Sequence, residues 1–165
     1  MPPEPASAAE GRLSAEERRE LAQLTQRYEN RRAASIEALR LVQRRHRWIS
    51  DERLAEIAGL LGMTPDELEG IATFYNLIFR RPVGRHVILL CDSISCWVMG
   101  RDALFDHLRR TLGVADAGTT PDGRFTLLPI VCLGHCDHAP AMMVDGDLHG
   151  DLDASCIEAL LRAYP

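Results

Sequence analysis

Four of the five cysteines in this chain fall into two close pairs in its second half. Cys91 and Cys96 form a C-x4-C pair, and Cys132 and Cys136 form a C-x3-C pair after residues 97–131. Thiolates that converge in this way suit a structural zinc ion or an iron–sulfur cluster. The sequence therefore predicts a fold that brings two loops that are distant in the sequence together around one metal centre.

The spacing within the pairs distinguishes the kinds of metal site. Structural zinc sites mostly use C-x2-C knuckles, so these longer spacings fit zinc poorly. A dithiol redox enzyme uses C-x-x-C, which the sequence lacks. A binuclear iron–sulfur cluster needs four thiolates, and Ser93, Ser95 and Gly134 allow the backbone to curl closely around such a centre. The pattern favours the cluster over a zinc-stapled interaction module, a thiol-redox regulator or four unconnected core cysteines.

Composition narrows the class of protein. The 165 residues are 46% hydrophobic, which is enough for one ordinary domain or two small ones. A net charge of −5 provides no basic footprint for nucleic acid, and no apolar run approaches the length of about 18 residues that spans a membrane. The N-terminus lacks the basic and apolar regions of a secretory signal, and we expect residues 1–12 to form a disordered lead. Cysteines in a chain that is not exported serve metal or redox chemistry more than disulfides.

Residues 13–80 show the apolar spacing of amphipathic helices. Capping boxes begin two of these helices, because Ser14 and Thr64 are each followed by a glutamate three residues later. The last helix should bury a face that includes Leu68 and Tyr75. The pattern therefore predicts a helical bundle domain over residues 13–80. The four predicted helices begin near Ser14, Arg32, Ser50 and Thr64.

The pattern changes after residues 81–84, where two short β-rich runs each end at a cysteine pair. Loops at the ends of strands are where α/β proteins build their sites. The order of elements predicts a β-α-β-β-α unit over residues 81–165. The expected elements are strands at 86–90 and 125–131, a helix at 100–112, a hairpin at 141–148 and a helix from 153 towards 161.

Other residues near these motifs have simpler interpretations. Cys156 is expected to be a small buried hydrophobe in the last helix, and Trp97 a packed lid beside the first cysteine loop. His135 and His138 are expected to be solvated loop residues, with tuning of a cluster as the alternative. An acidic run should form the solvated edge of the hairpin region. This run consists of Asp145, Asp147, Asp151 and Asp153.

The chain resembles the family of thioredoxin-like 2Fe-2S ferredoxin subunits, the E subunits, of bacterial NADH-quinone oxidoreductase, which is respiratory complex I. The second cysteine loop, CLGHC, is followed by Ala139-Pro140 as in that family, and the likeness covers roughly residues 14 to 165. Cys156 matches no ligand of the family. The segments that carry the resemblance are residues 32–39, 71–75, 81–86 and 123–129 together with the two cysteine loops.

The resemblance implies an α+β chain, in which the helical bundle precedes a thioredoxin-like α/β domain with one 2Fe-2S cluster. The family's four ligands map onto Cys91, Cys96, Cys132 and Cys136. The implied role is electron transfer beside the flavoprotein subunit that holds FMN and binds NADH, with the iron–sulfur subunit of the peripheral arm nearby. The complex would place the chain on the cytoplasmic face of the plasma membrane without direct insertion. Equivalent subunits of NAD-dependent formate dehydrogenases or hydrogenases are the alternative.

The sequence also indicates that the chain depends on a partner for hydride chemistry. It contains neither a G-x-G-x-x-G motif nor a P-loop. An iron–sulfur centre passes single electrons, whereas NADH gives up a hydride, so a flavin elsewhere has to convert one into the other. We therefore expect an electron-transfer subunit that does not catalyse a reaction alone.

Overall fold

The computed structural model describes residues 11–115 and 117–165. The chain divides into two compact units, a helical unit up to Pro82 and a sheet unit, Val83–Pro165. Most of the disordered lead predicted at residues 1–12 lies outside the described residues. Among the described helices, none has both the length and the hydropathy that a membrane crossing needs.

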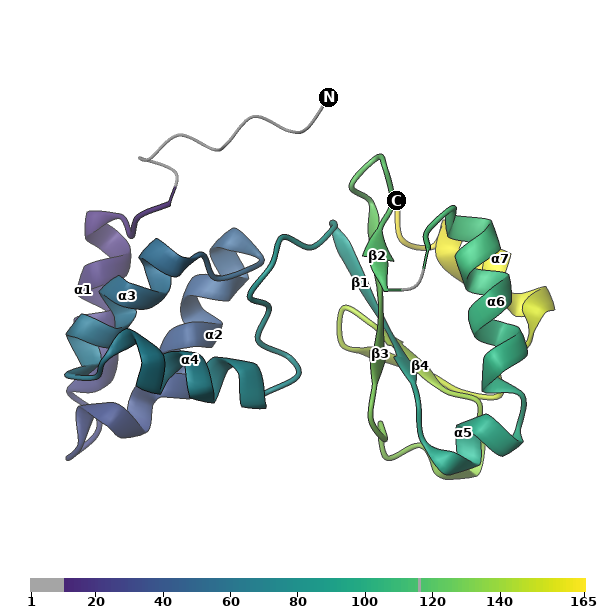
Figure 1. Ribbon diagram of the computed structural model, residues 1–165, viewed down its shortest axis with the longest axis horizontal. Helices are drawn as coiled ribbons and strands as arrows, with labels where there is room; N and C mark the ends of the chain where they lie inside the picture. The colour runs from purple at the N-terminus through teal and green to yellow at the C-terminus, as the bar shows by residue number, and fades with distance from the viewer. Residues whose placement is uncertain (1–10, 116) are drawn as a thin grey trace. The chain divides into compact units, whose positions relative to one another are not determined.

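The regular secondary structure in the described part of the helical unit consists of helices (Figure 1). Both predicted capping boxes are present, since the Ser14 and Thr64 side chains each accept a hydrogen bond from the N–H of the glutamate three residues later. The helix predicted from Arg32 begins instead as a 3-10 turn, whose cap Asn30 accepts a hydrogen bond from the Arg32 N–H. The elements are α1 (Ala15–Thr25), η1 (Arg31–Ala34), α2 (Ser35–His46), α3 (Asp51–Leu61) and α4 (Pro65–Phe74).

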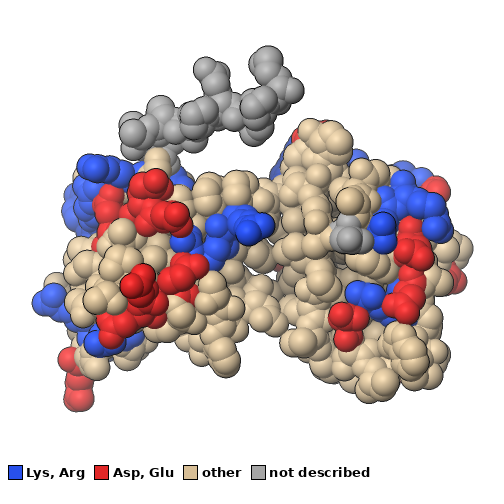
Figure 2. All heavy atoms as spheres, in the orientation of Figure 1, with Lys and Arg blue, Asp and Glu red and all other residues tan. Residues whose placement is uncertain are grey.

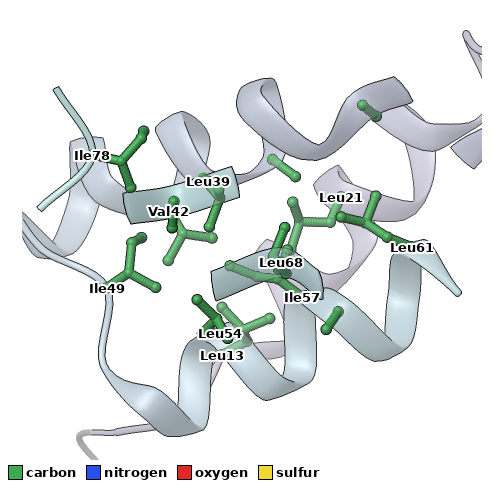
Figure 3. Packing of buried hydrophobic residues seen from close by; sticks show 14 of the residues in the cluster. Leu13, Leu21, Leu39, Val42, Ile49, Leu54, Ile57, Leu61, Leu68 and Ile78 are labelled. Carbon is green, nitrogen blue, oxygen red and sulfur yellow. The ribbon is translucent and has the colours of Figure 1, made fainter. Parts of the chain in front are cut away.

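The apolar faces of these helices meet in one core, shown in Figure 3. Leu21, Leu39, Ile57 and Leu68 come from α1, α2, α3 and α4 in turn, and none of them is more than 1% exposed. Burying each such side chain contributes about 1.5–3 kcal/mol. This packing stabilises helices that are too short to be stable alone.

The end of α4 differs from the predicted pattern. The sequence places Tyr75 on the buried face, but α4 ends at Phe74 and Tyr75 is an extended C-cap residue that is 41% exposed. Phe74 is also exposed, and the two rings pack edge to face with their centroids 5.3 Å apart. The helix ends before helical spacing can turn the Tyr75 ring inward.

The sheet unit contains a mixed sheet with helices (Figure 1). The predicted strands, helix, hairpin and final helix are all present, and α5, the short β2 and η2 are additional to the prediction. The elements are β1 (His86–Cys91), α5 (Ile94–Val98), α6 (Arg101–Leu112), β2 (Gly118–Thr119), β3 (Phe125–Ile130), η2 (Cys136–His138), β4 (Met142–Val144), β5 (Asp147–His149) and α7 (Ala154–Arg162).

The strand order is β2-β3-β1-β4-β5, with β1 and β3 side by side. These two strands are parallel, from His86 opposite Phe125 to Cys91 opposite Ile130. The other neighbouring strands pair in antiparallel fashion. Because β1 and β3 run in the same direction, their carboxyl ends lie at the same edge of the sheet. Cys91 and the segment that leads to Cys132 therefore leave the sheet from adjacent positions.

The core of the sheet unit lies between the sheet and the helices α6 and α7, which Figure 1 shows together on one side of the strands. Alternate residues of β1, Ile88 and Leu90, point into this core and are fully buried. Leu108 of α6 and Ile157 of α7 pack against them in the same cluster. Both parallel strands contribute side chains to this core, which therefore helps to position the loops that begin at their carboxyl ends.

Candidate metal centre

The first cysteine pair is buried at the carboxyl end of β1. Cys91 is the last residue of that strand and Cys96 lies in α5, and the two are 2% and 1% exposed. They pack with Ala139 and Ala141, and the Cys91 N–H donates to the Ala141 carbonyl at 3.1 Å. The expectation that residues 91–96 form a loop is therefore partly wrong, because the short helix α5 begins after Ser93 and places Cys96 in a buried position.

The second pair lies in the loop after β3 and is exposed. The sulfur atoms of Cys132 and Cys136 are 3.5 Å apart. Gly134 has a φ of +76°, in the region that glycine adopts without strain. Its N–H donates to the Cys132 sulfur at 3.3 Å. The glycine between the cysteines thus turns a backbone donor towards a sulfur, as a site for a negatively charged centre requires.

The structure brings the two pairs together. The Cys132 thiol interacts with Cys91 and with the Ser93 hydroxyl as well as with Cys136. The Cys136 thiol interacts with the Ser95 hydroxyl, and besides the hydrogen bond with Cys132, negative charge on Cys91 raises the pKa of Cys136. Cys91 interacts with Cys96 and Cys132 with Cys136, and the interaction of Cys132 with Cys91 links the two pairs. Within residues 11–115 and 117–165, no three His, Cys, Asp or Glu side chains are arranged as a group that could hold a metal ion.

The thiols of the site differ in acidity. The pKa of Cys132 is lowered, first by the hydrogen bond from the Gly134 N–H and then by the one with Cys136. The pKa of Cys136 is raised by the hydrogen bond with Cys132, and burial raises the pKa of Cys96. Because the thiolate is the form that binds metal, the lowered pKa makes Cys132 the thiol of these three that most readily takes that form.

Exposed apolar side chains lie on and next to α5 and directly before Cys132. Trp97 is 57% exposed, so it is not the packed lid that the sequence suggested. Figure 2 shows few charged atoms over the part of the surface where α5 lies. Clusters of exposed apolar residues commonly mark an interaction site. The residues that we name the α5 patch are Ile94, Trp97, Val98, Met99 and Val131, each of them at least 57% exposed.

Arg101, at the start of α6, is a residue near the site that the sequence analysis missed. Its side chain is 12% exposed, and its guanidinium lies 3.3 Å from a carboxylate oxygen of Asp92, which follows Cys91 directly. The same guanidinium lies over the Phe105 ring, 4.7 Å from its centroid. This ion pair ties α6 to the end of β1. Only the fold reveals it, because the sequence carries no signal that pairs these two residues.

His138 is exposed, as expected for a solvated loop residue, and His135 is partly buried, but both also have partners within the fold. The two rings stack with their centroids 4.7 Å apart, and His138 Nδ1 is 2.6 Å from a carboxylate oxygen of Asp151. That hydrogen bond is the main reason that the pKa of His138 is raised.

The acidic run is also more than a solvated edge, because each of its members makes a hydrogen bond within the fold. Most of these bonds join parts of the chain that are not adjacent, which a pattern of acidic residues alone does not reveal. Asp145 bonds to His86, Asp147 to Tyr164 and Asp151 to His138, and Asp153 caps α7.

Cys156 lies apart from the four other cysteines, on α7. It is half-buried against the core of the sheet unit, and its sulfur lies 3.1 Å from the Asp153 carbonyl oxygen, to which it donates. It therefore combines the expected packing role with a contact at the start of α7.

We expect Cys156→Ala to leave the cluster intact and to lower the free energy of unfolding by about 1 kcal/mol, because the change removes little more than one half-buried sulfur. Iron and sulfide analysis together with urea denaturation measures both effects. Cys156→Ser, which keeps a donor for the Asp153 carbonyl, is the matched control. Loss of iron from Cys156→Ala equal to the loss in a Cys132 variant would show that the ligand set is misassigned.

Proteins of known family are similar to this chain over most of its length. The family model for the thioredoxin-like [2Fe-2S] ferredoxin matches residues 21–165. The E subunit of the NADH-quinone oxidoreductase of Pseudomonas aeruginosa is 47% identical over 152 residues, which cover 92% of this chain and 92% of that protein. The protein of the same name from Escherichia coli strain K12 has the same identity and coverage. These relatives confirm the resemblance to the ferredoxin subunits of that oxidoreductase.

A solved structure adds a more distant likeness. The crystal structure of an NAD+-reducing [NiFe]-hydrogenase in its H2-reduced state matches 79% of this chain with a TM-score of 0.68 and 27% identity. This chain spans 22% of that one. The likeness is consistent with the alternative role, a subunit of an NAD-linked hydrogenase, only in the sense that the two families are related. The predicted thioredoxin-like fold, with its mixed sheet and helices, is confirmed. The chain belongs to the thioredoxin-like [2Fe-2S] ferredoxin family.

Proposed function

We propose that this chain is the electron-transfer subunit of an NADH-quinone oxidoreductase and that it holds its 2Fe-2S cluster through Cys91, Cys96, Cys132 and Cys136. The observation that carries the ligand assignment is the parallel pairing of β1 and β3, which starts both cysteine segments from adjacent positions at one edge of the sheet. Membership of the family supports the cofactor.

The residues of the site fit such a cluster. The donor set is four thiols in two pairs, the ligand set that binuclear clusters use. When bound, the cluster supplies a centre that exchanges one electron at a time. Cys91 and Cys96 hold the buried side of the site, and Cys132 and Cys136 close the exposed side. The Gly134 N–H aimed at Cys132 disperses negative charge on the sulfur and so favours the reduced state.

The partner that we propose is the flavoprotein subunit that holds FMN and binds NADH, with the iron–sulfur subunit of the peripheral arm beside it. The α5 patch supports a partner surface next to the thiols, because an exposed apolar cluster of this kind is stabilised when another protein covers it. We assign residues 13–80 as the helical bundle domain and residues 81–165 as the ferredoxin domain. Within the complex, the chain would be peripheral to the cytoplasmic face of the membrane.

Affinity purification from native membranes tests this function. The tagged chain is expected to bring down the flavoprotein together with membrane subunits of a quinone reductase. Val98→Asp, which places a charge in the α5 patch, should lose most of that material. Thr111→Asp, which adds the same charge to an exposed position on α6, is the matched control and should retain it. Recovery of a formate dehydrogenase or hydrogenase subunit instead would replace the proposed complex with one of those enzymes.

A further inference from the structure

The second cysteine loop has few anchors of its own. Cys132 and Cys136 are exposed, and between β3 and β4 the only regular structure in this described stretch is the three-residue η2. Leu133 of this loop is partly buried and packs against the buried side chains of Cys91 and Cys96. A loop with so little burial needs support from another segment if it is to hold two sulfurs at fixed positions.

Gly150, directly after β5, supplies one such support through close backbone approach. A Cβ atom at this position would lie 2.5 Å from the Cβ of His138 and 2.7 Å from two ring atoms of His135. These separations are shorter than side-chain packing allows. The backbone of Gly150 therefore lies against the stacked pair of imidazoles on either side of Cys136, in a space that admits no side chain.

Asp151 supplies the second support through two hydrogen bonds to one residue. Its N–H donates to the His138 carbonyl at 2.7 Å, and its carboxylate lies 2.6 Å from His138 Nδ1. Asp151 has a φ of +52°, a left-handed conformation that aspartate adopts more readily than most residues. In that conformation both its backbone and its side chain reach His138.

We propose that Gly150 and Asp151 are positioning residues that hold the second cysteine loop in the geometry that binds the cluster. They act through His135 and His138, the residues that they contact. The inference rests on the proposed ligand set, in which Cys132 and Cys136 are two of the four ligands. Groups that orient metal ligands from outside the coordination shell typically change metal affinity by about 10–100-fold when they are mutated.

The test uses the full-length, cluster-loaded protein. Gly150→Ala forces the two segments apart, and Gly118→Ala is its control, because among the described residues a Cβ at Gly118 meets Val114 alone, at an ordinary 3.9 Å. Asp151→Gly removes the carboxylate without straining the left-handed backbone, and Asp151→Asn keeps an acceptor for His138. The readouts are the rate of iron release to a chelator, the EPR g-values and reduction potential of the remaining cluster, and the unfolding of each metal-free variant.

We expect Gly150→Ala to release iron about 10-fold faster than the wild type and to show shifted g-values. Asp151→Gly should show a smaller change in the same direction, because its carboxylate is largely exposed, and Asp151→Asn should restore the wild-type rate. The metal-free variants should unfold like the metal-free wild type.

Two results would overturn the proposal. One is wild-type release rates and g-values in Gly150→Ala and Asp151→Gly. The other is faster release with unchanged g-values and an equally lowered stability of the metal-free fold, which would mean general destabilisation. If Gly150→Ala does not fold, Asp151→Gly decides the matter. A wild-type protein without any iron–sulfur cluster would contradict the proposed function itself, which is a separate outcome.

Discussion

Alanine in place of Cys91, Cys96, Cys132 or Cys136 is expected to abolish or degrade the cluster. Each thiolate supplies one of the four protein bonds that a binuclear cluster uses. Changes to groups that merely orient a ligand cost about 10–100-fold in metal affinity, and removal of the ligand itself should cost more. Iron and acid-labile sulfide should fall from about two of each per chain towards zero. Elemental analysis, visible absorption and EPR of the dithionite-reduced protein measure the loss.

The two pairs should differ in what happens to the metal-free fold. Cys91 and Cys96 are buried, so their alanine variants also lose packing and should lower the unfolding midpoint of the metal-free protein. Cys132 and Cys136 are exposed, and their variants should leave that midpoint unchanged. Cys156→Ala is the control that keeps the cluster. One zinc per chain and no sulfide in the wild type would contradict the assignment and favour the zinc-stapled interaction module.

The second large effect concerns the electron donor. We expect dithionite to bleach the visible spectrum of the purified chain and NADH alone to leave it unchanged. NADH gives up a hydride, which needs an acceptor of two electrons and a site for the dinucleotide. The sequence carries no dinucleotide motif, and the cluster takes single electrons. Addition of the flavoprotein subunit with its FMN should make NADH an effective reductant.

Stopped-flow absorption with and without the flavoprotein measures this difference. A chain carrying Cys132→Ala, mixed with the same flavoprotein, is the control that separates cluster reduction from flavin absorption. The contrary result is rapid bleaching by NADH in protein shown to be free of flavin. That result would require a nucleotide site on this chain and would remove the reason for assigning FMN and NADH to a partner.

Features that depend on neighbouring residues could be predicted closely from the sequence. The capping boxes at Ser14 and Thr64 are present because a cap bonds to a residue three positions away, and both partners are visible in the sequence. The hairpin at Asp145-Gly146 is equally local. The order of strands and helices also predicted that both cysteine pairs would begin at strand ends. Parallel pairing of β1 and β3 then places those ends together.

The errors lie where an element is too short for its pattern to be recognised or where burial depends on a distant segment. The helix α5 spans only Ile94–Val98, less than two turns, so its periodicity cannot be distinguished from that of a loop. Trp97 on that helix and Tyr75 after α4 have large aromatic side chains, and residues of this type are buried more often than charged residues are. Both are exposed because nothing in the chain covers them in the described structure.

Local sequence was thus sufficient for the cysteine pairs, the capped helices and the strand-end position of the site, because each depends on residues a few positions apart. The tertiary structure was needed for the contacts between the two cysteine loops and for the surroundings of the second loop. Gly150 lies against His135 and His138, and Asp151 bonds to His138 across thirteen positions of chain, as Asp92 does to Arg101 across nine. No spacing rule pairs such residues, since only the packing of β5 and α6 against the site brings them into contact.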